Sequence, residues 1–145
     1  MRIYNSVYHA ILFSLPASPL ETGGIIGGSD GTITQYILDT GANNAHGYGM
    51  YAPDTAFLNR NIETWSKMGI AFYGIFHSHF PISTALSISD KRYISQIMVA
   101  LFPQVTTLYF PIVIPHSHMS VYRACIDSSG VSIFRDEIEI INGGT

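Results

Sequence analysis

Three segments of the chain place apolar residues at the spacing of a helix. Residues 5–15 permit a short helix that a proline ends, because proline cannot continue a helical hydrogen-bond ladder. A second helix is predicted to open at Pro53 and Asp54 and to stop at Gly69, and a third to run over residues 87–101. The apolar stripes of the second and third predicted helices consist of Leu58, Ile62, Trp65, Ile94, Ile97, Met98 and Leu101.

Short apolar or alternating runs predict the strands. Residues 21–38 contain a Ser-Asp-Gly turn signal and predict a hairpin, and residues 70–76 form an apolar run that suits a strand buried on both faces. Residues 107–140 predict three strands, with breaks near Pro115 and residues 128–130. This order of elements predicts an α/β protein in which a single mixed β-sheet is flanked by helices.

Composition narrows the class of protein. A length of 145 residues with 47% hydrophobic residues allows one compact core and predicts a single domain over residues 1–145. Ten acidic and seven basic residues offer no broad cationic surface, which argues against nucleic acid as a partner. No apolar run is long enough for a membrane span. The single cysteine, Cys125, fits a reducing compartment, so we expect a soluble, cytoplasmic protein.

Polar side chains interrupt this apolar chain in the stretch YGIFHSHFPISTALSISD, residues 73–90. In an extended strand His77 and His79 share a face, with their Cα atoms about 6.6 Å apart, and two imidazoles on one face can converge on one metal ion. The stripe of the third predicted helix, continued backwards in steps of three and four, reaches Asp90 and then Ser87. Both side chains are therefore expected to point the way the buried face points.

The inward carboxylate of Asp90 has two explanations. An unpaired buried charge is very costly, and a divalent cation shared with the two histidines would neutralise it. Two histidines and one carboxylate leave a fourth position of zinc open, which is the arrangement of a hydrolytic site. Alternatively, Ser87-x-x-Asp90 fits a helix N-terminal capping box. A second His-x-His pair, His116 and His118, has no acidic residue after it until Asp127, so we expect loop or strand-end histidines there.

The spacing His77-Ser78-His79, seven residues, Ser87, two residues, Asp90 resembles the zinc motif of the JAMM (MPN-plus, JAB) metalloproteases. The upstream segment PLETGGIIGG resembles the element that carries the glutamate of that family, which here is Glu21. The order of helices and strands also resembles the family fold, a JAB/MPN architecture similar to cytidine deaminases, over nearly the whole chain. One departure is that Phe80 separates the second histidine from proline, which puts the substrate preference in doubt rather than the activity.

The resemblance implies a role for each residue. His77, His79 and Asp90 would bind one Zn²⁺ per chain, and Glu21 would take a proton from the attacking water and deliver it to the leaving amine. Ser87 would donate a hydrogen bond to the oxyanion. The glycines that follow Glu21 permit a close approach of backbone, which would suit a substrate tail laid beside the site as an added strand.

The resemblance also implies a substrate class. Family members remove ubiquitin or ubiquitin-like proteins after a C-terminal Gly-Gly, by deconjugation or by precursor processing, and prokaryotic relatives also act on sulfur-carrier proteins. The short chain predicts a stand-alone, prokaryotic-type member. Alternatives are a non-catalytic scaffold of the same fold and a metal-free domain in which Ser87 and Asp90 only cap a helix. The residues that could either receive the tail of a partner or pack in the core are Tyr48, Tyr51, Phe80 and Ile82.

Overall fold

The computed structural model describes residues 1–17, 21–39, 51, 53–79 and 83–143. Its helices are α1 (Asn5–Ser14), α2 (Thr55–Lys67) and α3 (Ile88–Leu101). Its strands are β1 (Arg2–Tyr4), β2 (Gly23–Ser29), β3 (Thr32–Asp39), β4 (Ala71–Ser78), β5 (Thr107–Ile114), β6 (His118–Asp127), β7 (Gly130–Asp136) and β8 (Glu139–Ile141). The described strands form one eight-stranded mixed sheet in the order β7-β6-β5-β4-β2-β3-β1-β8. The predicted class, an α/β protein with a single mixed sheet flanked by helices, is confirmed.

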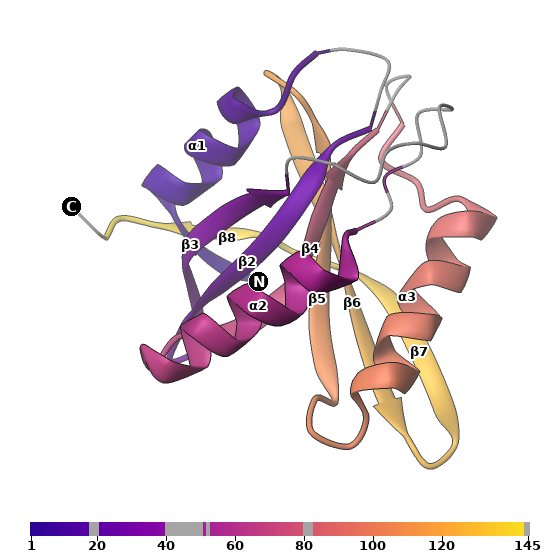
Figure 1. The fold of residues 1–145 in the computed structure, drawn as a ribbon. Helices are drawn as coiled ribbons and strands as arrows, with labels where there is room; N and C mark the ends of the chain where they lie inside the picture. Colours follow the sequence, from indigo (N-terminus) through magenta and orange to yellow (C-terminus); the bar gives the residue numbers. More distant parts are fainter. Residues whose placement is uncertain (18–20, 40–50, 52, 80–82, 144–145) are drawn as a thin grey trace.

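The helices cover the two faces of the sheet unequally. Helix α1 lies apart from α2 and α3, which run along the same side of the sheet (Figure 1). Successive residues of β2 and β4 point to opposite faces, so Ile26 and Phe76 pack with α1, while Ile25 and Ile75 pack with α2 and α3. All four side chains are buried, so the sheet has a hydrophobic core on each side.

The three helices begin and end near the predicted residues. Asp54 caps α2, because its carboxylate accepts hydrogen bonds from the N–H groups of Ala56 and Phe57. Gly69, just after α2, has a φ of 76°, a conformation that glycine adopts at little cost. Ser87 caps α3. Local signals therefore predicted these boundaries correctly.

The C-terminal region contains one strand more than the three predicted. Strand β8 pairs in parallel with β1, which the sequence did not predict either, through partners such as Ile3 and Ile140. Each of these strands has only three residues, too few to show an alternating pattern. Tertiary pairing, rather than local sequence, makes them strands.

Strand β4 has a central place that positions the candidate site. It pairs antiparallel with β2 and parallel with β5, and its residues from Gly74 to Ser78 are all buried. In the antiparallel register Gly23 lies opposite His77. Continuing that register places Glu21 opposite His79 and on the same face, so the residues before β2 lie beside the end of β4.

The glycines of β2 do not serve a substrate strand as predicted. Strand β2 is paired on both sides, with β3 and with β4, so neither of its edges is free for an added strand. A Cβ at Gly23 would lie 2.3 Å from the Phe76 carbonyl oxygen, and a Cβ at Gly24 would lie 2.1 Å from that of Ile37. The close approach that glycine permits here is made by the neighbouring strands of the protein itself.

Several sequence predictions fall on other parts of the chain. Three of the residues that could receive the tail of a partner lie outside the described residues: Tyr48, Phe80 and Ile82. Within the described ranges, no helix has both the length and the apolar character needed to cross a bilayer.

Candidate metal centre

Four side chains from three separate parts of the chain converge at the end of β4. The Nε2 atoms of His77 and His79 lie 3.0 Å apart. The carboxylate of Asp90, in the first turn of α3, contacts both rings, with Oδ1 3.2 Å from Nε2 of His77 and Oδ2 3.0 Å from Nε2 of His79. Oε1 of Glu21, just before β2, lies 3.7 Å from Nε2 of His79. The predicted site residues His77, His79, Asp90 and Glu21 are therefore brought together.

The donor atoms fit a divalent cation. One potential ligand atom from each of Glu21, His77 and His79 lies within 4.8 Å of the other two, so these three residues form a possible metal-binding group. Tetrahedral zinc with Zn–N bonds of about 2.0–2.1 Å places neighbouring ligand atoms roughly 3.4 Å apart. The contacts of 3.0–3.2 Å among His77, His79 and Asp90 are close to that separation. Nitrogen and carboxylate ligands suit zinc and other transition metals, so the geometry supports a metal centre without identifying the metal.

The two imidazoles differ at their second nitrogen. Nδ1 of His79 lies 2.9 Å from the carbonyl oxygen of Ser83. Because a carbonyl only accepts hydrogen bonds, Nδ1 carries a proton. Nε2 donates to Asp90 when it is protonated as well, and once that proton is lost it would present its lone pair to a metal. Nδ1 of His77 is buried and has no hydrogen-bond partner among the described residues.

The surroundings push the pKa values of the two carboxyl groups in opposite directions. Burial alone would raise the pKa of Asp90, but its hydrogen bonds with His77 and His79 outweigh burial and hold the pKa well below its usual range. Burial raises the pKa of Glu21, and the nearby His77 and the N–H of Tyr51 offset only part of that rise. Asp90 thus stays ionised, as a metal ligand must, while Glu21 is better suited to take up a proton.

The capping explanation for Ser87 and Asp90 is confirmed, and it does not exclude metal binding. Oγ of Ser87 accepts a hydrogen bond of 3.0 Å from the N–H of Asp90, and Oδ2 of Asp90 accepts one of 2.9 Å from the N–H of Ser87. This capping box fixes the carboxylate at the helix start while it contacts both histidines. One side chain therefore serves the helix and the candidate centre together.

Tyr51 contacts the residues of the site, although the sequence gave no sign of its contacts with Glu21 and His77. Only 7% of the residue is exposed, and its ring stacks against that of His77 with centroids 6.2 Å apart. Its N–H donates to Oε2 of Glu21 over 3.0 Å, and its hydroxyl donates to Oδ2 of Asp39 over 2.9 Å. Of the two roles left open for this tyrosine, the structure supports packing. Contacts between residues far apart in the sequence have no local signature.

The second His-x-His pair lies in a different environment. His116 stands in the turn between β5 and β6 with a φ of 63°, and its ring packs against Phe13. His118 begins β6, and its Nδ1 lies 2.8 Å from Oγ of Ser117. Both histidines are exposed, and neither joins a group of three possible metal ligands within the described ranges. The prediction of loop and strand-end histidines is confirmed.

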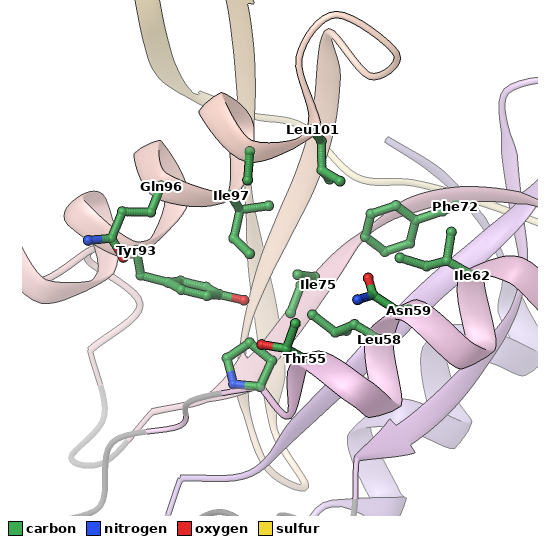
Figure 2. Close-up of a pocket in the computed structure, with 12 residues that line it drawn as sticks. Thr55, Leu58, Asn59, Ile62, Phe72, Ile75, Tyr93, Gln96, Ile97 and Leu101 are labelled. Carbon is green, nitrogen blue, oxygen red and sulfur yellow. The ribbon is translucent and has the colours of Figure 1, made fainter.

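A cavity of about 420 Å³ lies between α2 and α3 (Figure 2). Ile75, on its sheet side, lies two residues before His77 on β4, and Tyr93 lies one helical turn after Asp90 on α3. The cavity therefore opens on the same face of the sheet as the candidate metal centre. Most of its other lining residues are apolar, and they include Leu58, Ile62, Phe72, Ile97 and Leu101. The sequence alone did not reveal this cavity.

Comparison with known proteins supports the fold. No protein-family model matches the chain, and no curated protein sequence matches it. The solution structure of a Desulfitobacterium hafniense protein is 21% identical with a TM-score of 0.67, over 98% of this chain and 93% of that one, and shows a shared fold. The crystal structure of a JAB1/MPN domain protein from Archaeoglobus fulgidus is 17% identical with a TM-score of 0.48, over 98% of this chain and 100% of that one.

Proposed function

We propose that the chain is a JAMM-type zinc peptidase that cleaves after the C-terminal Gly-Gly of ubiquitin or a ubiquitin-like protein. The observation that carries the proposal is the convergence of two imidazoles and two carboxylates on one centre. These residues lie in the spacing that resembles the family motif, and the upstream glutamate reaches the same point. Because a peptide or isopeptide bond is very stable in water, its hydrolysis needs an activated water, a polarised carbonyl and an oxyanion donor.

The contacts suggest which group holds the metal and which moves protons. His77, His79 and Asp90 would hold zinc, since the carboxylate of Asp90 contacts both rings. Bound zinc would polarise the scissile carbonyl and the attacking water. Oε1 of Glu21 lies 3.7 Å from Nε2 of His79, farther from that ring than the carboxylate of Asp90. Oε2 of Glu21 accepts a hydrogen bond from the N–H of Tyr51. That carboxylate is positioned to take a proton from the attacking water and to deliver it to the leaving amine.

We assign to Ser87 the role of hydrogen-bond donor to the oxyanion. Its hydroxyl oxygen already accepts the N–H of Asp90 in the capping box, which leaves its O–H free to donate outward. The side chain is exposed at the start of α3, beside the candidate metal centre. An O–H donor held at that place can stabilise the negative charge that develops on the carbonyl oxygen.

The exchange Glu21→Gln tests the proposal. The variant should keep its fold and about one zinc per chain, because the amide preserves the shape of the side chain and the three ligands remain. Cleavage of a Gly-Gly-linked fusion should fall by roughly 10²–10⁴-fold, the usual contribution of a positioned proton acceptor. Zinc content is measured by metal analysis after zinc-replete purification, and cleavage by gel or mass spectrometry. Normal cleavage by the variant, or less than about 0.1 zinc per wild-type chain, would refute the proposal.

The substrate class requires a panel of fusions. Ubiquitin, ubiquitin-like proteins and sulfur-carrier proteins, each joined through Gly-Gly to a reporter by a peptide or a lysine isopeptide bond, would be compared at equal concentration. The proposal predicts cleavage of at least one member by the wild-type chain and of none by Glu21→Gln. A wild-type chain that holds zinc and cleaves no member would instead favour the non-catalytic scaffold.

A further inference from the structure

The backbone of Ser83 orients one of the two histidines. The carbonyl of Ser83 accepts the hydrogen bond from Nδ1 of His79 over 2.9 Å. With this hydrogen bond made, the ring turns its Nε2 toward Asp90 and His77. Orientation of a ligating histidine by a carbonyl at its other nitrogen is common in metal sites, and loss of the partner weakens metal binding. What holds Ser83 therefore matters for the centre.

The residue after Ser83 is tied to β6 at two points. The hydroxyl of Tyr122 donates to the carbonyl oxygen of Thr84 over 3.0 Å, and Oγ of Ser120 donates to Oγ1 of Thr84 over 3.0 Å. Ser120 and Tyr122 lie two residues apart on β6, so their side chains point to the same face of the sheet. Ser120 pairs with Ile112 of β5, and Ile112 pairs with His77 of β4. The two hydroxyls thus stand on the side of the sheet that carries the candidate centre.

A third hydrogen bond determines which hydroxyl donates and which accepts between Ser120 and Thr84. Nη2 of Arg135, on β7, donates to Oγ of Ser120 over 2.8 Å. Because the guanidinium only donates, Ser120 accepts with its oxygen and is free to donate its own proton to Thr84. Ser120 is only 6% exposed, so water competes little for its hydroxyl. We call Ser120, Tyr122 and Arg135 the β6–β7 anchor.

We propose that the β6–β7 anchor positions His79 as a metal ligand by holding residues 83 and 84, an inference that rests on the proposed zinc function. With the anchor intact, the segment is ordered before a metal binds. Without it, part of the binding free energy is used to order the segment and to turn the ring of His79. A purely structural role for these hydroxyls would change the stability of the fold and leave the metal affinity and the ligand geometry unchanged.

The test is Tyr122→Phe in the full chain, which removes one hydroxyl and keeps the ring. The matched control is Tyr109→Phe on β5, a half-buried tyrosine whose hydroxyl makes no hydrogen bond within the described part of the chain. Zinc dissociation constants come from competition with a chelating dye. We expect zinc to bind about 10-fold more weakly to Tyr122→Phe, and with wild-type affinity to the control. The visible absorption bands of the Co²⁺-loaded chain should shift in Tyr122→Phe alone.

A second variant, Thr84→Val, covers the case in which Tyr122→Phe does not fold. It removes the oxygen that Ser120 contacts and preserves the shape of the side chain, and it should also weaken zinc binding and shift the Co²⁺ bands. Wild-type affinity and wild-type Co²⁺ spectra in the folded variants would overturn the positioning role while leaving the proposed function intact. A wild-type chain that takes up no zinc would overturn both.

Discussion

The chain carries the pattern His-Ser-His twice, and the two copies have different structures. His77 lies in the central strand β4 and His79 directly follows it; both are buried, and their Nε2 atoms lie 3.0 Å apart. His116 and His118 span the exposed turn into β6, where the positive φ of His116 interrupts the alternation of an extended strand. The same three letters thus make a pair of converging rings in one place and two surface side chains in the other.

The difference lies in the neighbours rather than in the histidines. Carboxylates from two distant segments, Glu21 and Asp90, reach the first pair. Within the described ranges, no set of three possible ligands includes a histidine of the second pair. A His-x-His motif therefore becomes a candidate metal site only when the fold supplies a buried position and acidic partners. The experiments below would break or sharpen this contrast.

Replacing a ring of the first pair should have the largest effect. His79→Ala removes a proposed ligand, so zinc affinity should fall by more than the roughly 10–100-fold typical of groups that only orient a ligand. Cleavage of the Gly-Gly fusion should fall to background. Isothermal titration with zinc and the cleavage assay measure the two effects. Full zinc occupancy in this variant would contradict the proposed ligand set.

Asp90→Asn separates the two tasks of this residue. The amide can still accept the N–H of Ser87, so α3 should keep its cap, but the negative charge beside His77 and His79 is lost. We expect zinc binding to weaken by at least about 10-fold, since a neutral amide is a poorer ligand than a carboxylate. The melting temperature of the metal-free chain serves as the control for the cap. Wild-type zinc affinity would show that capping is the only task of Asp90.

Ser87→Ala should have a moderate effect. Loss of the side-chain cap should lower the free energy of unfolding by about 1 kcal/mol, measured by urea denaturation of the metal-free chain. Zinc should still bind, because Asp90 and both histidines remain. If Ser87 also donates to the oxyanion, kcat should fall by about 10²–10³-fold with little change in KM. An unchanged kcat would limit Ser87 to the cap.

The second histidine pair should respond least. In the double variant His116→Asn and His118→Asn, zinc content and cleavage should match the wild type. Asparagine tolerates the positive φ of position 116, so stability should change by no more than about 0.5 kcal/mol. Reduced zinc content would reveal a second metal site and remove the contrast between the two pairs.

Local chemistry explains what the sequence determined by itself. The apolar stripes and caps of α2 and α3 are set by residues within a few positions of one another, and so is the turn at Asp30 and Gly31, where both φ values are positive. The inward direction of Asp90 also follows from helical periodicity, because the stripe continues backwards from Ile94. These features could be predicted because each depends on a short segment.

Tertiary structure alone decided which distant segments meet. The register of β2 against β4 brings Glu21 to His79, the ring of Tyr51 packs on that of His77, and β6 holds Thr84, next to the carbonyl that orients His79. The pairing of β1 with β8 and the cavity between α2 and α3 arise in the same way. The spacing of residues within one segment carries no information about its partner strands, which are selected by the packing of the whole core.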